Sequence, residues 1–157
     1  MSENQAPMLE VRGLTKHFDV SPPLLNRVLN GTGKISLKAV ENVNFRIPKG
    51  KTFGLVGESG CGKSTVARLV VRLYEPTAGS VNLEGIDLGG LNSRGAMEPM
   101  RRKMQMIFQD PYASLNPRWR VAEIIAEPIR THRLLSDEKE IQKRVAELLM
   151  QVSLSPA

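Results

Sequence analysis

The chain has 157 residues, of which 41% are hydrophobic and 24% charged, as in an ordinary globular domain with an apolar core. No apolar run approaches the roughly 20 residues that span a bilayer, and the first residues carry no signal-peptide pattern. The single cysteine excludes an internal disulfide and suits a reducing compartment. The net charge of +6 comes with scattered basic residues and only 4% aromatic residues, so we expect no nucleic-acid partner.

The first predicted elements are strands separated by an insertion. Residues 9–14 alternate apolar and polar side chains, which is typical of an edge strand, and residues 37–47 alternate again. Between residues 19 and 36, prolines and glycines predict an inserted loop with one short helical turn over residues 24–29. The short apolar run at residues 52–56 predicts a buried strand.

The residues after this strand form the most informative motif in the chain. They fit G-x-x-x-x-G-K-[ST], the phosphate-binding loop of P-loop nucleotide-binding proteins. The motif comprises Gly57, Glu58, Ser59, Gly60, Cys61, Gly62, Lys63, Ser64 and Thr65. Residues 64–73 predict a helix directly behind it, and this strand–loop–helix setting disfavours the alternative of a glycine-rich turn without function.

The chemistry of phosphate binding explains the spacing of this motif. Glycines let the backbone turn tightly and bring its N–H groups to phosphate oxygens, and the helix N-terminus adds further unpaired N–H groups. We expect Lys63 to reach the β- and γ-phosphates, Ser64 to ligate Mg²⁺ and Thr65 to hold the α-phosphate region. Cys61 is interpreted as a small residue that fits the loop, in preference to a redox group. The loop therefore predicts binding of a nucleoside triphosphate.

The chain continues with two short strands and a segment rich in methionine. Residues 80–85 and residues 104–108 both have the apolar pattern of a short strand. Met97, Met100 and Met104 recur at helical spacing, and this pattern favours adaptable core packing over a metal or ligand role.

Two helices are predicted in the last third of the chain. Residues 121–127 have a helical pattern, which Pro128 ends or bends. The second helix begins with Ser136 or Asp137 as its N-cap. Its apolar residues fall on one helical face and are Ile141, Val145, Leu148, Leu149 and Val152.

Two further segments narrow the class of P-loop protein. The pattern Leu9-x-Val11-x-x-Leu14-x-x-x-Phe18 ends in an aromatic residue well upstream of the phosphate loop. Downstream of the loop, the sequence MIFQDP places Gln109 at the end of a predicted strand. Together with the phosphate loop, these segments resemble the first half of an ABC transporter ATP-binding subunit, and the resemblance covers essentially all 157 residues.

The subgroup follows from the long run QDPYASLNPR at residues 109–118 and from the insertion after Phe18, which make the resemblance closest to the oligopeptide/dipeptide (and nickel) importers. The resemblance implies an α/β fold, namely the P-loop NTPase core of an ABC ATPase with an N-terminal antiparallel β part and the start of a helical subdomain. It implies one domain over residues 1–157, with the nucleotide-binding β/α core at 1–108 and the Q-loop and the start of the helical subdomain at 109–157. We expect this fold to be incomplete, with the C-terminal half of the domain absent.

The resemblance also implies roles for single residues. Phe18 matches the aromatic residue that stacks on adenine, and the alternative is a core aromatic residue at a strand end. Gln109 matches the glutamine that completes the Mg²⁺ shell and senses the γ-phosphate. Lys63 and Gln109 are then the catalytic candidates, and Ser64 and Gln109 are the candidate metal ligands. The implied cofactors are ATP and Mg²⁺.

The implied function is import of peptides across the cytoplasmic membrane, driven by ATP binding and hydrolysis. Such a subunit works with transmembrane permease subunits, which residues 110–120 are expected to contact, and with a second ATP-binding subunit, either identical or related. It is a peripheral protein on the cytoplasmic face of the cell (inner) membrane. The transported solute, whether an oligopeptide, a dipeptide, nickel or another, is left open, because other proteins of such importers select it.

Three motifs of the family are missing from the sequence: an LSGGQ-type signature, an Asp-Glu pair after four apolar residues, and a switch histidine. His17 and His132 fit no such motif, and we expect both at the surface. Phosphoryl transfer to water needs a group that orients or deprotonates the attacking water. We therefore expect the N-terminal portion of an ATPase, which binds ATP weakly or not at all, hydrolyses it poorly and is marginally stable or prone to aggregate.

Two alternatives belong to other functional classes. A truncated, non-catalytic nucleotide-binding or interaction module would share the same fold. A small P-loop kinase would need a lid rich in catalytic arginines, for which Arg118 and Arg120 are the available residues. The kinase hypothesis leaves Phe18 and Gln109 unexplained, so the importer ATPase is the favoured interpretation.

Overall fold

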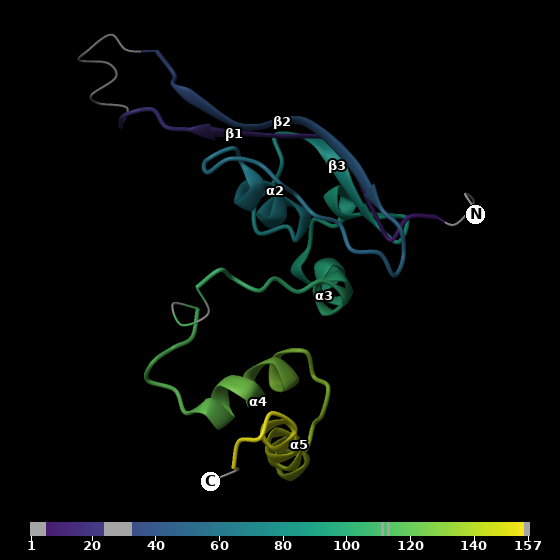
Figure 1. Cartoon of the computed structure of the whole chain (residues 1–157), viewed down its shortest axis with the longest axis vertical. Helices are drawn as coiled ribbons and strands as arrows, with labels where there is room; N and C mark the ends of the chain where they lie inside the picture. Colours follow the sequence, from purple (N-terminus) through teal and green to yellow (C-terminus); the bar gives the residue numbers. More distant parts are fainter. Residues whose placement is uncertain (1–5, 24–32, 111, 113, 156–157) are drawn as a thin grey trace. The chain divides into compact units, whose positions relative to one another are not determined.

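A computed structural model describes residues 6–23, 33–110, 112 and 114–155 of the chain (Figure 1). The chain divides into two compact units, Met1–Met104 and Gln105–Ala157, and each unit has its own apolar core. The helical turn predicted over residues 24–29 lies outside the described residues. None of the helices in the described part of the chain is long and apolar enough to cross a bilayer.

The first unit is built on an antiparallel sheet of four strands in the order β2-β1-β3-β4 (Figure 1). The strands are β1 (Leu9–Asp19), β2 (Ser36–Ile47), β3 (Ala78–Leu83) and β4 (Ile86–Asp87). The prediction of an edge strand over residues 9–14 is wrong, because β1 pairs with β2 on one side and with β3 on the other. Alternation reports that a strand has one buried face; it does not report whether both of its edges are paired.

The side chains on the two faces of β1 differ in their burial. Leu9 and Val11 are buried in the core, whereas Glu10 lies between Arg12 and Arg46 on the outer face and forms ion pairs with both. The hydrogen bond from Arg12, followed by that from Arg46, lowers the pKa of the Glu10 carboxyl below its ordinary value, although its partial burial opposes this shift.

The core of the first unit lies between the apolar face of this sheet and three short helices. The helices are α2 (Lys63–Val70), the 3-10 helix η1 (Leu88–Gly90) and α3 (Arg94–Lys103). Each helix contributes apolar side chains that are buried with those of β1 and β3, namely Val66, Leu69, Leu88, Met97 and Met100. The methionine spacing therefore serves core packing, as predicted, and Met104 packs partly buried against the same core.

The helix after the phosphate loop is shorter than predicted. It ends at Val70 because Arg72 takes a left-handed conformation, with φ of 56°. The N–H groups of Leu73 and Tyr74 then both donate to the carbonyl oxygen of Arg68, at 2.9 and 3.2 Å. These bonds satisfy a carbonyl that the helix end would otherwise leave unpaired, and they stop the helix three residues before Leu73.

The strands predicted at residues 52–56 and 104–108 do not form. Both segments are irregular, and most of their apolar side chains are exposed, with Val56 94% and Ile107 92% accessible. A strand exists only when a neighbour satisfies its backbone N–H and C=O groups, and no strand among the described residues pairs with either segment. The ring of Phe53 instead stacks on that of Phe45 from β2, with the centroids 4.9 Å apart.

The second unit is a helical pair, α4 (Val121–Thr131) and α5 (Glu138–Gln151). Pro128 does not end α4, which continues for three residues beyond it. Asp137 is the N-cap of α5, since its carboxylate accepts from the N–H of Lys139 at 3.1 Å, and this settles the alternative with Ser136. The buried side chains between the helices are Ala126, Ile129, Ile141, Val145 and Leu149.

Two residues predicted on the buried face of α5 are not fully buried. Leu148 is half-buried, and Val152 is exposed because it follows the last helical residue. Arg130 of α4 links the two helices through an ion pair to Glu138 of α5, and it also pairs within α4 with Glu123 at 2.8 Å. The hydrogen bond from Arg130 is the main cause that lowers the pKa of Glu138 below its ordinary value. These groups are exposed to solvent, so the apolar contacts carry most of the packing energy.

Candidate functional site

The phosphate loop begins at residue 57, after the irregular segment, and continues directly into α2, which starts at Lys63. Gly60 and Gly62 have φ of 82° and 95°, a region that side chains with a Cβ rarely adopt. Gly62 is the N-cap of α2, and the N–H of Val66 donates to its carbonyl oxygen at 2.9 Å. The predicted transition from loop to helix is therefore confirmed, one residue earlier than the sequence indicated.

The N-terminus of α2 has the hydrogen-bonding capacity and the charge to bind an anion. No side chain of the described residues caps it, and its first turn, Lys63 to Val66, contains no acidic residue. The first N–H groups of an α-helix have no partner within the helix, and the helix dipole places partial positive charge beside them. An anionic oxygen at this end would satisfy both the hydrogen-bonding capacity and the charge.

The side chain of Lys63 folds back over the loop. Its ammonium group donates to the carbonyl oxygens of Gly57, at 2.7 Å, and of Glu58, and it lies 3.5 Å from the sulfur of Cys61. A positive charge is thus held at the loop by two backbone carbonyl oxygens of the loop itself. A bound phosphate would replace some of these carbonyl contacts with stronger charge-assisted hydrogen bonds.

Cys61 is exposed in the loop, and its sulfur limits the room beside Gly57. A Cβ added at Gly57 would lie 2.7 Å from its sulfur, which is closer than atoms pack without moving. Gly57 therefore has no room for a side chain while Cys61 keeps this position, and the interpretation of Cys61 as a small residue that fits the loop stays a prediction.

A β-bulge in β2 supports the loop from the sheet. The register of β1 and β2 pairs Lys16 with Val40 and His17 with Lys38, so Ala39 has no partner in the described ladder. The carbonyl oxygen of Ala39 would lie only 2.5 Å from a Cβ built on Gly62. The backbone of β2 therefore approaches the end of the loop so closely that only glycine fits there.

Phe18 lies near the end of β1, opposite Leu37 of β2 and two positions along β2 from the bulge at Ala39. Its half-buried ring meets the ring of Tyr74 edge to face, with centroids 5.4 Å apart and an interplanar angle of 82°. The ammonium nitrogen of Lys16 lies 5.1 Å from the centroid of Phe18. The sheet thus brings Phe18 to the strand that contacts the loop, while its stacking on adenine stays a prediction.

Gln109 belongs to the second unit, where it is exposed in an irregular segment. Its expected contact with a metal ion and the γ-phosphate stays a prediction, because the loop that is predicted to hold the phosphates belongs to the first unit.

The prediction that both histidines lie at the surface holds only in part. His17 and His132 are half-buried, and Nε2 of His17 and Nδ1 of His132 are buried without a hydrogen-bond partner among the described residues. His17 lies in β1, and its backbone N–H donates to the hydroxyl of Thr77 at 3.0 Å. His132 ends α4, where the chain folds back and the N–H of Leu134 donates to the carbonyl oxygen of Ile129.

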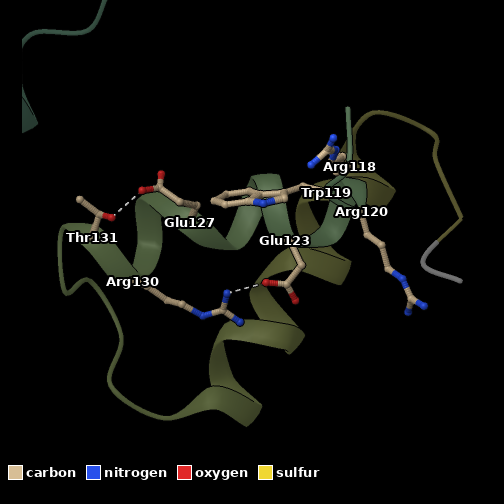
Figure 2. A pocket seen from close by; sticks show the side chains of 7 residues that line it. All are labelled: Arg118, Trp119, Arg120, Glu123, Glu127, Arg130 and Thr131. Atoms are coloured by element: carbon tan, nitrogen blue, oxygen red, sulfur yellow. Dashed lines mark hydrogen bonds and ion pairs between the residues drawn. The ribbon is translucent and has the colours of Figure 1, made fainter. Parts of the chain in front are cut away.

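The second unit carries an open hollow of about 620 Å³ beside α4. Figure 2 shows the indole of Trp119 lying along this helix. Glu127 accepts from the hydroxyl of Thr131 at 2.7 Å, and Glu123 accepts from Arg130 at 2.8 Å. The remaining lining residues are Arg118 and Arg120. The hollow shares no residue with the phosphate loop, so it is a separate surface feature.

The comparisons with known proteins agree on one family. Residues 40–157 match the family model described as "ABC transporter". The oligopeptide transport ATP-binding protein OppF of Bacillus subtilis is 51% identical over 148 residues, which are 94% of this chain and 45% of that protein. The di/tripeptide transport ATP-binding protein DppF of Pseudomonas aeruginosa is 41% identical over 149 residues, which are 95% of this chain and 44% of that protein.

The fold has a counterpart among solved structures. A dimeric structure of a post-hydrolysis state of the ATP-binding cassette MJ0796, bound to ADP and Pi, superposes with a TM-score of 0.73 at 27% identity. The likeness covers 94% of this chain and 58% of that cassette. The chain spans less than half the length of the curated relatives that it matches.

Proposed function

The chain belongs to the ABC transporter family, and on this premise we propose that its first unit binds the triphosphate of ATP. The observation that carries the proposal is the N-terminus of α2, which has no side-chain cap. It follows a loop whose conformation requires glycine, and the ammonium group of Lys63 folds back over this loop. Backbone N–H groups of residues 57–65 would bind the phosphate oxygens, and Lys63 would reach the β- and γ-phosphates.

The residues present also fit a magnesium ion. Ser64 is exposed in the first turn of α2, and its hydroxyl is a hard oxygen donor of the kind that Mg²⁺ takes together with phosphate oxygens and water. Gln109 would supply a second oxygen ligand from its side-chain amide. Bound Mg²⁺ would neutralise charge on the β- and γ-phosphates.

We assign the nucleotide-binding core to residues 1–108, and the Q-loop and the start of a helical subdomain to residues 109–157. The division of the chain into units at residues 104 and 105 lies close to this boundary and supports it. Lys63 and Gln109 are the catalytic candidates within the chain. Hydrolysis is proposed for the importer ATPase as a whole, because the sequence offers no carboxylate in the setting of a catalytic base.

In the proposed importer, ATP binding and hydrolysis drive the uptake of peptides. The support is the identity of 41–51% with proteins named for oligopeptide and di/tripeptide transport. The protein would act at the cytoplasmic face of the membrane with permease subunits and a second ATP-binding subunit. The hollow beside α4, with its exposed Trp119 and flanking arginines, is the surface of the second unit that we propose for the permease contact.

Replacing Ser64 by alanine tests the metal part of the proposal. We expect the affinity of the unsubstituted chain for ATP to fall about tenfold when EDTA removes Mg²⁺, and that of Ser64→Ala to change about twofold or less. In EDTA the two proteins should bind ATP alike. Calorimetric titration with ATP, with and without Mg²⁺, measures all four affinities.

The control for this experiment is Ser36→Ala, which removes an exposed hydroxyl of the same unit from the start of β2. It should retain the full dependence on Mg²⁺. An equal dependence on Mg²⁺ in Ser64→Ala and in the unsubstituted chain would contradict the assignment of Ser64 as a metal ligand.

A further inference from the structure

Four half-buried side chains of the first unit, among them Phe18, form a continuous series of contacts. Arg68 of α2 donates from Nη1 to the hydroxyl of Tyr74 at 3.4 Å, and its guanidinium carbon lies 5.7 Å from the centroid of that ring. The Tyr74 ring meets Phe18 edge to face at 5.4 Å. Lys16 completes the series, with its ammonium nitrogen 5.1 Å from the centroid of Phe18.

The backbone of Tyr74 is fixed to the helix that begins at the phosphate loop. Its N–H donates to the carbonyl oxygen of Arg68 at 3.2 Å, beside the bond from Leu73 to the same oxygen. Both the ring and the main chain of Tyr74 are therefore anchored on the last turn of α2. The side chain of a residue held in this way has little freedom to swing away from Phe18.

The segment after Tyr74 is fixed to β1 in turn. Lys16 donates from its ammonium group to the carbonyl oxygen of Glu75 at 2.7 Å. Thr77 bonds to the β1 residues on either side of Lys16, with its N–H donating to the carbonyl oxygen of Thr15 at 2.8 Å and its hydroxyl accepting from the N–H of His17 at 3.0 Å. Three consecutive residues of β1 next to Phe18 are thus tied to residues 75–77.

We propose that Tyr74 is a positioning residue for the nucleotide base, which holds the ring of Phe18 in the orientation that stacks on it. The inference rests on the proposed binding of ATP, together with the prediction that Phe18 stacks on adenine. Edge-to-face contact and a nearby cation both favour one ring orientation. If the ring of Phe18, the platform for the base, is already ordered before binding, less side-chain entropy is lost when the base stacks on it. Because Tyr74 is anchored on α2, the platform for the base and the loop for the phosphates keep a fixed separation.

Comparing the affinities for ATP and for inorganic tripolyphosphate distinguishes a positioning role of Tyr74 from a general structural role, because tripolyphosphate has no base. In calorimetric titrations with Mg²⁺, Tyr74→Leu should weaken ATP binding about three- to tenfold and leave tripolyphosphate binding unchanged. Tyr74→Phe keeps the ring and loses only the bond to Arg68, so it should bind ATP within about twofold of the unsubstituted chain. Lys16→Met should weaken ATP binding about threefold, again without effect on tripolyphosphate.

The matched control is Phe45→Leu, which removes a ring from the other aromatic pair of the unit, the stack with Phe53. It should leave the ratio of the two affinities unchanged. The positioning role is overturned if Tyr74→Leu weakens both ligands equally or neither. If Tyr74→Leu does not fold, an unchanged ratio in Lys16→Met overturns it. Failure of the unsubstituted chain to bind either ligand would contradict the proposed function itself.

Discussion

Replacing Lys63 by alanine should weaken ATP binding about 10- to 100-fold. The ammonium group is held over the phosphate loop by the carbonyl oxygens of Gly57 and Glu58, where bound phosphates would receive it. Hydrogen bonds between charged partners contribute about 1.5–3 kcal/mol, and 1.4 kcal/mol corresponds to a factor of ten in affinity. The loss should apply equally to ATP and to tripolyphosphate, since Lys63 contacts only the phosphates. Calorimetric titration with both ligands measures it.

The control for this substitution is Lys51→Ala, which removes the same charge from an exposed position of the first unit. It should change ATP affinity about twofold or less, because exposed charges at a distance are screened by salt. Thermal melting of each variant checks that the loop still folds without the Lys63 contacts. Equal ATP affinities of Lys63→Ala and Lys51→Ala would show that the loop is not the phosphate site.

Replacing Gly79 by alanine should destabilise the first unit by about 2–4 kcal/mol. Gly79 lies in β3 between Ala78 and Ser80, where the register with β1 shifts, and has φ of 88°. An added Cβ would lie 2.3 Å from the carbonyl oxygen of Gly13 and 2.6 Å from that of Arg12. These are backbone atoms of an interior strand, so β1 and β3 would have to separate to make room. Urea unfolding followed by circular dichroism measures the loss.

Gly85→Ala is the matched control for this substitution. Gly85 has nearly the same backbone conformation, with φ of 80°, but no described heavy atom lies within 4 Å of a Cβ built there. Its substitution should therefore cost only about 1–2 kcal/mol, the strain of a left-handed residue that carries a Cβ. If the two variants lost the same stability, the close approach of β3 to β1 at Gly79 would not be a determinant of the fold.

Features that short-range chemistry determines were predictable from the sequence. The phosphate loop, the helix that follows it and the Asp137 cap of α5 depend on glycines, caps and spacing within a few residues. The antiparallel β part and the start of a helical region followed from the family resemblance. The likeness to solved ATP-binding cassettes confirms this fold class, over part of a cassette.

Features that depend on distant neighbours could not be read from the sequence in the same way. Residues 52–56 and 104–108 have the composition of strands, but a strand forms only against a partner, and apolar pattern carries no information about partners. The same limit explains why β1 was predicted at the edge of the sheet. Tyr74 was overlooked because its role depends on a contact with Phe18, which lies 56 residues earlier in the chain.

The most direct test of the account maps ATP onto the chain itself by ¹⁵N-amide chemical shifts, which also report weak binding. Addition of Mg²⁺ and ATP should shift the amide signals of residues 57–65 most strongly, with smaller shifts around Phe18 and Tyr74. Tripolyphosphate should shift the amide signals of residues 57–65 but not those around Phe18 and Tyr74. Shifts confined to residues 118–131 around the hollow beside α4, or no shifts at millimolar ATP, would contradict the claim that this loop binds the triphosphate.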